Sequence, residues 1–200
     1  MSPRSAKQLD DIRKQKKELI METALELFAN NGFHATTISQ IARKAGISKG
    51  LAYNYFESKN ELLQELIDQG FQEVGDMMVP EKDGFPTDGE FASFVGNSFD
   101  MVGNDLRHWR LFYSLLLQPT VAENFNEKYA KISEPFFKMM YAYIAGKGNT
   151  DPEGDVMIIS SMIEGALLYL IVASEIFPKE QLKQKVIEGI FRIIESGHQK

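Results

Sequence analysis

The sequence contains no cysteine, which excludes disulfides, a thiol nucleophile and thiolate ligands for zinc or iron–sulfur clusters. Its longest uninterrupted apolar run, residues 166–173, is eight residues long, whereas a helix needs about 20 to cross a bilayer. The N-terminal residues lead into charged sequence and not into an apolar stretch, which predicts no secretory signal. We therefore expect a cytoplasmic protein with no membrane partner.

Catalytic motifs are scarce as well. The three histidines, His34, His108 and His198, lie far apart and show no metal-ligand spacing. The pattern of glycines and serines matches neither a phosphate-binding loop nor a nucleophile elbow. The sequence predicts a protein that is not an enzyme and that uses no metal and no cofactor.

Charge is distributed unevenly along the chain, although the net charge is −6 overall. Residues 1–60 contain ten lysines and arginines but only six acidic residues, a net charge of +4. Residues 61–200 have a net charge of −10. Such asymmetry is typical of a chain in which one domain binds a polyanion, but a solvated basic surface gives the same pattern.

Apolar residues recur at spacings of three, four and seven, and the alternating patterns of strands are absent. The sequence therefore predicts an all-α fold of about nine helices. Glycine, proline and capping residues place them at residues 9–31, 38–45, 49–56, 59–78, 90–104, 106–118, 121–145, 154–176 and 179–196. Two prolines and two glycines predict a loop at residues 80–89.

Residues 36–59 have the pattern of a helix-turn-helix. Gly46 permits a tight turn between two short helices, and Thr37 with Gln40 forms the sequence of a capping box before the first. Ser48 is a helix cap for the second. In this motif the second helix presents its N-terminal residues to the major groove of DNA.

The residue types along this motif suit contacts to DNA. Hydroxyl groups at helix starts and tyrosine hydroxyls donate to phosphates, lysine and asparagine read base edges, and leucine contacts the thymine methyl group. We expect phosphate contacts from Thr37, Ser48, Tyr53, Tyr55 and Lys59, and base contacts from Lys49, Leu51 and Asn54. Each residue type is also common on exposed helices, so the ordered set carries more weight than any single member.

This part of the chain resembles the TetR family of transcriptional regulators. The residues that carry the resemblance are Ile20, Ala24, Leu27, Phe28, Gly32, Phe33, Thr37, Ile38, Ile41, Ala42, Ala45, Gly46, Ile47, Ser48, Gly50, Tyr53, Tyr55, Phe56, Lys59 and Leu62. The resemblance adds Gly50 to the expected DNA-binding residues. Ala52 departs from the family pattern, which usually has a bulkier apolar residue there, and we expect looser packing of the recognition helix.

The resemblance implies a three-helix DNA-binding domain at residues 9–58, followed at residues 59–200 by a helical bundle for ligand binding and dimerisation. It also implies a homodimeric repressor that binds a palindromic operator. The basic cluster at residues 13–17 has two interpretations. It extends the contact with DNA, or it is the solvated side of the first helix.

Aromatic and methionine residues are frequent between residues 91 and 177. Most of them are expected to form the bundle core, but such residues can also line an apolar cavity between helices. The resemblance implies a small-molecule pocket here, for which the candidates are Trp109, Phe112, Tyr113, Phe136, Met139, Met140, Tyr143 and Met162. Three polar residues, Arg110, His108 and Glu164, could orient a ligand or serve as surface and capping charges.

The last two helices, residues 154–176 and 179–196, are expected to pair with the same helices of a second subunit. The expected stripe on the first is Val156, Ile159, Ile163, Ala166, Leu167 and Leu170, and on the second Ile187, Ile190, Phe191 and Ile194. The resulting hypothesis is a ligand-responsive repressor released from double-stranded operator DNA by an unknown small apolar effector. The alternative is a ligand-independent DNA-binding or protein-interaction regulator.

Overall fold

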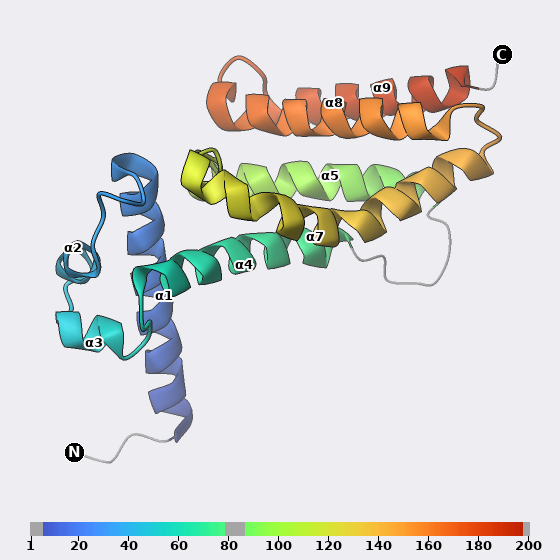
Figure 1. Cartoon of the computed structure of the whole chain (residues 1–200). Helices are drawn as coiled ribbons and strands as arrows, with labels where there is room; N and C mark the ends of the chain where they lie inside the picture. Colours follow the sequence, from blue (N-terminus) through green and yellow to red (C-terminus); the bar gives the residue numbers. More distant parts are fainter. Residues whose placement is uncertain (1–5, 79–86, 198–200) are drawn as a thin grey trace. The chain divides into compact units, whose positions relative to one another are not determined.

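The computed structural model describes residues 6–78 and 87–197, and in these ranges it contains nine helices and no strand. The all-α prediction is therefore confirmed. The helices are α1 Ala6–Asn31, α2 Ile38–Lys44, α3 Lys49–Tyr53, α4 Lys59–Met78, α5 Asp88–Asn104, α6 Leu106–Leu116, α7 Pro119–Gly146, α8 Pro152–Ala173 and α9 Lys179–Ser196 (Figure 1).

Several of the predicted boundaries are wrong. The first helix begins at Ala6 and not at residue 9, and the helix predicted to reach residue 56 ends at Tyr53. Pro119 was expected to end a helix, but it begins α7, because the first helical position needs no backbone N–H. The helix predicted to reach residue 176 ends at Ala173, and Phe177 and Ile176 donate their N–H groups to the Ala173 carbonyl in a tight turn. Most of the predicted loop at residues 80–89 lies outside the described residues, although Thr87 and Glu90 form a capping box for α5.

The first compact unit consists of Met1–Gly70 and Leu111–Glu123. It therefore extends past the predicted boundary at residue 58 and includes a segment that is distant in sequence. Its buried apolar side chains come from α1, α2, α3, α4, α6 and the start of α7, and from the turns that precede α2 and α4. The largest of those with at most 1% exposure are Ile20, Phe28, Ile41, Phe56, Leu62 and Leu115.

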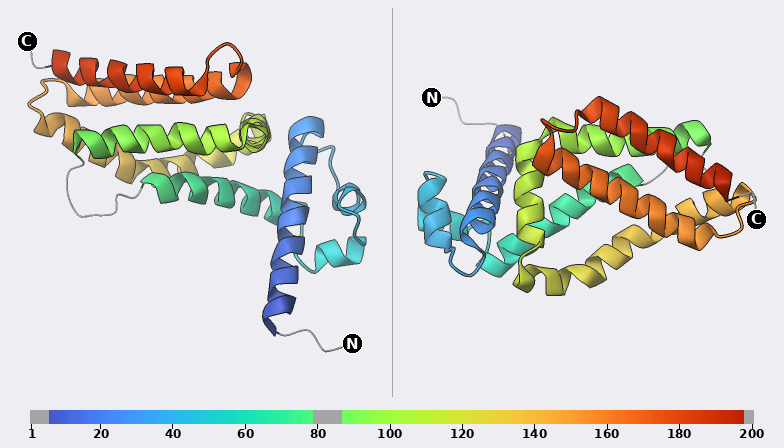
Figure 2. Two further views of the ribbon diagram at one scale, coloured as in Figure 1. Left: turned by 180° about the vertical axis from the view of Figure 1, so that it is seen from behind. Right: turned by 90° about the horizontal axis from the view of Figure 1, so that it is seen from above.

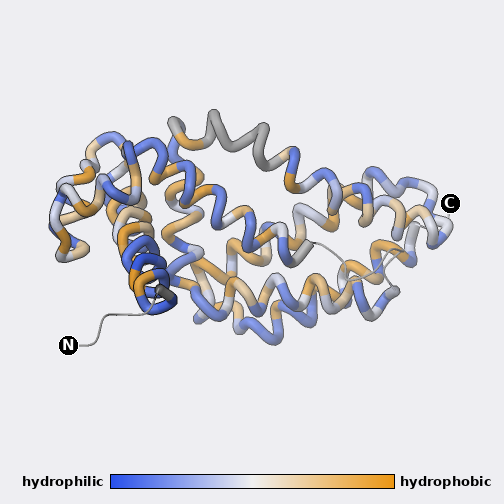
Figure 3. Tube along the Cα trace, turned by 90° about the horizontal axis from the view of Figure 1, so that it is seen from below, coloured by the Kyte–Doolittle hydropathy of each residue, from blue (hydrophilic) through white to orange (hydrophobic). Residues whose placement is uncertain are grey.

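The second compact unit consists of Phe71–Arg110 and Asn124–Lys200. Within it α5, α8 and α9 pack against one another, and α8 and α9 run side by side in both views of Figure 2. Apolar and polar residues alternate in short groups along the helical trace (Figure 3), as is typical of helices that bury one face. The buried side chains include Phe91, Val95, Phe99, Ile159, Leu170, Ile190 and Ile194.

Charged groups connect the helices of the second unit at its surface. Lys179 and Lys183 of α9 donate to the Asp100 carboxylate of α5 over 2.8 and 3.2 Å, and they hold the pKa of Asp100 below its usual value. Tyr143 of α7 donates to Asp88 over 2.7 Å, and burial together with this bond raises the pKa of the phenol.

The apolar stripe predicted to pair with a second subunit is wrong for most of its members. Ile159, Ile163, Ala166, Leu167 and Leu170 are at most 9% exposed and form the core of the second unit. A different face of α8 is exposed and apolar, and it consists of Met157, Ile158, Leu168, Tyr169 and Val172. We call these five residues the outer face of α8.

The composition of α8 reflects both faces. The helix has 22 residues, and an 18-residue window of it has a mean hydropathy of 2.1, which by length and composition would suffice to cross a membrane. Only 33% of that apolar window is buried within the chain. The longest uninterrupted apolar run, residues 166–173, did not reveal the length of this apolar helix, because single polar residues interrupt the apolar ones.

Helices α4 and α6 approach closely within the first unit. Gly70 of α4 is buried, and a Cβ atom placed on it would lie 2.3 Å from the ring of Phe112, which is itself only 3% exposed. The aromatic ring therefore occupies the space that any side chain at position 70 would need. Gly75, one and a half turns later, would place its Cβ 3.9 Å from Ile132, an ordinary contact.

We predict that Gly70→Ala lowers the free energy of unfolding by about 1–3 kcal/mol, because the buried ring of Phe112 has to move. Gly75→Ala is the matched control on the same helix. It is expected to raise the free energy of unfolding by up to about 1 kcal/mol, because alanine is the better helix former. Thermal and urea denaturation followed by circular dichroism measure both. Equal effects of the two substitutions would contradict the close packing of Phe112 on Gly70.

Candidate nucleic-acid interface

Helices α2 and α3 form the predicted helix-turn-helix beside α1 (Figure 1). Gly46 stands between them with φ +67°, and the next N–H, that of Ile47, donates to the Ala42 carbonyl over 3.0 Å. Ile38, Ile41 and Ala42 of α2 are buried, as is Ala52 of α3. One side of the motif is therefore held against the core of the first unit.

Both helices of the motif begin with the predicted caps. The Thr37 hydroxyl accepts from the Gln40 N–H over 3.2 Å, and the Gln40 side chain accepts from the Thr37 N–H over 2.7 Å, which completes a capping box. The Ser48 hydroxyl accepts from the Leu51 N–H over 3.1 Å. These bonds fix where each helix starts, and they leave both side chains exposed.

Helix α3 presents most of the predicted DNA-binding residues to solvent. Lys49, Gly50, Tyr53 and Asn54 are exposed, and Tyr53 keeps 45% of its surface. The Lys49 ammonium group lies 5.7 Å from the centre of the Tyr53 ring, so these two residues, four positions apart, share one side of the helix. The structure therefore brings together a cation, a phenol and an amide on a helix that is otherwise fixed by its core.

The other two predicted residues of this stretch, Leu51 and Tyr55, are half-buried. Ala52, the position that departs from the family pattern, is 1% exposed. Its small side chain is enclosed, and Phe56, four residues later, is equally buried. A Cβ atom at Gly50 would meet nothing within 4 Å, so packing within the chain does not require glycine at this position.

Lys59 differs from the other predicted contacts because its ammonium group already has acceptors within the chain. Its Nζ atom donates to the carbonyls of Phe33, His34 and Thr36 over 2.7, 3.2 and 2.9 Å. The same atom lies 4.4 Å from the centre of the Phe33 ring. Lys59 therefore holds the turn between α1 and α2, a role that its position in the sequence did not reveal.

The basic residues of the first unit fall into two groups. Lys17 pairs with Glu65 and lies 5.8 Å from the centre of the Phe56 ring, and Lys44 pairs with Glu26 over 2.6 Å. Arg13 and Lys14, in the basic cluster of α1, are exposed. Within residues 6–78 and 87–197, neither Arg43 nor Lys49 has a carboxylate partner.

The predicted ligand residues lie in the packed interior for the most part. Trp109, Phe112, Phe136, Met140 and Tyr143 are at most 6% exposed, whereas Tyr113, Met139 and Met162 are half-buried. Phe136 stacks on Phe94 with ring centres 4.8 Å apart, and Tyr143 stacks on Phe91 at 4.9 Å. These contacts account for Phe136 and Tyr143 as core residues of the second unit.

The polar residues considered for ligand orientation also differ in their surroundings. Arg110 donates to the Ile171 carbonyl in the last turn of α8 over 2.9 Å. It therefore has the capping role that was expected as the alternative to ligand binding. The Nε2 atom of His108 lies 3.7 Å from the Glu73 carboxylate. Glu164 is exposed on α8.

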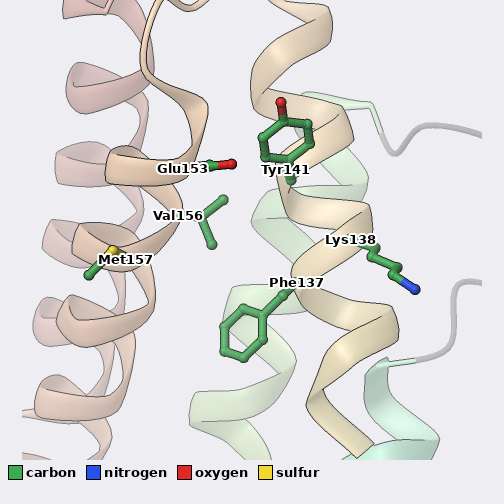
Figure 4. A pocket seen from close by; sticks show the side chains of 6 residues that line it. All are labelled: Phe137, Lys138, Tyr141, Glu153, Val156 and Met157. Atoms are coloured by element: carbon green, nitrogen blue, oxygen red, sulfur yellow. The ribbon is translucent and has the colours of Figure 1, made fainter. Parts of the chain in front are cut away.

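A surface groove of about 410 Å³ lies between α7 and α8 (Figure 4). Its lining is Phe137, Lys138, Tyr141, Glu153, Val156 and Met157. None of the eight predicted ligand residues belongs to it. Two of its members, Tyr141 and Met157, are exposed apolar residues, so the groove adjoins the outer face of α8.

Residues 20–66 match the family model of bacterial regulatory proteins, tetR family. The HTH-type transcriptional regulator YerO of Bacillus subtilis is 35% identical over 128 residues, 62% of this chain and 42% of YerO. YuxN of the same organism is 48% identical over 54 residues, 27% of this chain and 19% of YuxN. The alignments therefore span less than half the length of these curated relatives.

Solved structures extend the likeness to the whole fold. A transcriptional regulator of Aquifex aeolicus superposes with a TM-score of 0.69 at 23% identity, covering 89% of this chain and 99% of that one. At this identity the superposition shows the shared fold alone. Residues 20–66 therefore form a domain of the kind found in bacterial regulatory proteins of the tetR family, and the chain as a whole shares the fold of solved regulators of that kind.

Proposed function

We propose that the protein is a homodimeric, cytoplasmic repressor that binds a palindromic operator in double-stranded DNA through α3. The observation that carries the proposal is the exposed set of Lys49, Tyr53 and Asn54 on α3 and its C-cap, a helix that is held in place by the buried Ala52. A short helix held in this way enters the major groove, where side chains read base edges. The net charge of +4 over residues 1–60 favours the approach to phosphates.

Each exposed residue has a role in this proposal. Lys49 and Asn54 read base edges, and Leu51 contacts a thymine methyl group. Tyr53 and Tyr55 donate to phosphates, as do the hydroxyl groups of the two caps, Thr37 and Ser48. Gly50 lets the backbone of α3 approach the duplex, which accounts for a glycine that the packing of the chain does not require.

The outer face of α8 supports the proposed dimerisation through α8 and α9. Large apolar residues on one face of a helix are costly in water, and a second copy of the same face covers them with twofold symmetry. Gly165, three residues before Leu168, has no side chain to keep a second helix at a distance, and a Cβ atom placed there would meet nothing within 4 Å in the chain. Two subunits supply two recognition helices, which is what a palindromic operator requires.

The effector in this proposal is a small apolar molecule that binds the helical bundle and favours the state that does not bind DNA. Its expected contacts remain Trp109, Phe112, Tyr113, Phe136, Met139, Met140, Tyr143 and Met162. Among them, Tyr113, Met139 and Met162 are half-buried and have exposed surface that a ligand can contact. In the alternative, the same DNA-binding unit acts without a ligand.

We predict that Lys49→Ala weakens operator binding by about 1–3 kcal/mol, because a base contact is lost. Tyr53→Phe, which removes only the hydroxyl, should cost about 0.5–1.5 kcal/mol. Operators are first selected from random duplexes, and affinities are then measured by fluorescence anisotropy at several salt concentrations. Lys131→Ala, an exposed lysine of α7 in the second unit, controls for the loss of one charge. Equal affinities for the wild type and Lys49→Ala would contradict the role of α3.

We predict that Lys59→Met destabilises the fold, because three backbone carbonyls lose a charged donor. The expected loss in free energy of unfolding is about 1–3 kcal/mol. Lys49→Met, at an exposed position, should change it by less than about 0.5 kcal/mol. Urea denaturation without DNA separates the two lysines, and the same stability for both variants would show that the Lys59 bonds hold nothing in place.

We predict that Leu168→Glu combined with Val172→Glu converts the protein to monomers. These side chains are 44% and 62% exposed in the single chain, so the substitutions leave the core intact and place charges in the proposed interface. Sedimentation velocity should give about twice the chain mass of 22.7 kDa for the wild type and 22.7 kDa for the variant. Leu9→Glu, an exposed leucine of α1, is the control that stays dimeric. A monomeric wild type would refute this interface.

A further inference from the structure

The C-terminal end of α1 is completed by a side chain from a distant part of the chain. Gly32 follows the helix with φ +84°, and its N–H donates to the Phe28 carbonyl over 3.0 Å. In the usual glycine-ended helix that is closed by two bonds, the next N–H also turns back to a carbonyl of the last turn. Here the next N–H, that of Phe33, has another partner.

That partner is Gln118. The Phe33 N–H donates to the Gln118 Oε1 atom over 3.0 Å, and the Gln118 Nε2 atom donates to the Phe28 carbonyl over 2.8 Å. The side-chain amide thus lies between the two backbone groups and satisfies both. The two bonds cross 85 and 90 residues of sequence, and all the groups involved are in the first compact unit.

The turn that Gln118 completes leads directly into the helix-turn-helix. Thr36 is 1% exposed, and its hydroxyl lies 2.9 Å from the Gly32 carbonyl and 3.2 Å from that of Leu27. Lys59 binds three more carbonyls of the same turn. Thr37, the cap of α2, is the next residue. The position of the turn therefore determines where α2 starts, and α3 follows after only four residues.

Gln118 is itself held by the helices on either side of it. Its N–H donates to the Leu115 carbonyl of α6 over 3.1 Å, and its carbonyl accepts from the Val121 N–H of α7 over 2.9 Å. The Phe112 ring, in the preceding turns of α6, is fixed against Gly70. A shift of the junction between α6 and α7 consequently moves the amide that completes the end of α1.

We propose that Gln118 is a positioning residue through which operator affinity depends on the place of the α6–α7 junction. The inference rests on the proposed DNA-binding function, and it adds a connection between the α6–α7 junction and the helix-turn-helix. When the amide is in place, both backbone groups are satisfied. When the junction shifts, a half-buried N–H and a carbonyl lose their partner, so the turn takes up another arrangement.

Two substitutions of similar size test the bonds. Gln118→Met keeps the volume and removes both hydrogen bonds. Gln118→Glu keeps the acceptor for the Phe33 N–H, but its ionised carboxylate has no proton to give to the Phe28 carbonyl. A protonated glutamic acid accepts and donates as the amide does, so Gln118→Glu can be restored by acid and Gln118→Met cannot.

We expect Gln118→Met to bind the selected operator about tenfold more weakly than the wild type at neutral pH. Gln118→Glu should be equally weak at about pH 7.5 and should approach the wild type at about pH 5.5, where its carboxylate beside a carbonyl takes up a proton. Affinities are expressed relative to the wild type at each pH, so that the titration of groups present in both proteins does not affect the comparison. Gln64→Met and Gln64→Glu, on the exposed side of α4, are the controls and should stay near the wild type throughout.

Hydrogen exchange supplies a second test. Replacing a residue with a purely structural role would not alter the effect of operator binding on amide exchange. Because coupling between sites is reciprocal, operator binding should slow amide exchange in residues 111–118 of the wild type. The slowing should be absent in Gln118→Met. Stoichiometric titration with DNA gives the active fraction of each variant, so that unfolding is not counted as weak binding.

The outcomes separate this inference from the proposed function. A wild type that selects no duplex refutes the proposed function. A wild type that binds, with Gln118→Met equally tight or Gln118→Glu insensitive to pH relative to it, overturns the role of Gln118 and leaves the function intact. If the weaker binding of Gln118→Met is fully explained by a smaller fraction of active protein, the inference is overturned as well. Acid rescue together with the loss of slowed exchange supports it.

Discussion

The satisfaction of the backbone groups that follow α1 is the constraint on which the DNA-binding unit depends. A helix end leaves carbonyl groups without partners, and burying them unpaired is costly. In this chain the turn from Gly32 to Thr37 is closed by a hydroxyl, an ammonium group and an amide, from Thr36, Lys59 and Gln118. Because three side chains bind carbonyls of this turn and of the end of α1, the short helices after it have a defined position although each contains few residues.

This arrangement accounts for the division of labour between two lysines that look alike in the sequence. Lys49 extends from α3 into solvent beside Tyr53, where it is available to a partner. Lys59, ten residues later, places its charge on the carbonyls of the turn and only partly in solvent. A basic residue near a helix-turn-helix is thus not necessarily a DNA contact. Its acceptors within the chain decide which role it has.

Helix α8 shows the same dependence on surroundings for apolar residues. Its high hydropathy comes from two faces with different environments. Ile159, Ile163 and Leu170 fill the core of the second unit, whereas Leu168 and Val172 remain exposed. The sequence pattern located the helix correctly, but the face that it reserved for a second subunit is buried within the chain, because a helix that is apolar on most sides does not indicate by periodicity which side is covered.

Local chemistry in the sequence was sufficient to determine the all-α fold, most of the helix ends and the helix-turn-helix with its caps. These features depend on residues within one or two turns of each other, as in Thr37 with Gln40 and Ser48 with Leu51. The contacts of Gln118 with Phe28 and Phe33, and of Phe112 with Gly70, appeared only in the tertiary structure. They join residues 42 to 90 positions apart, and periodicity and capping rules extend only over a few turns, so the folding of the chain alone brings these groups into contact.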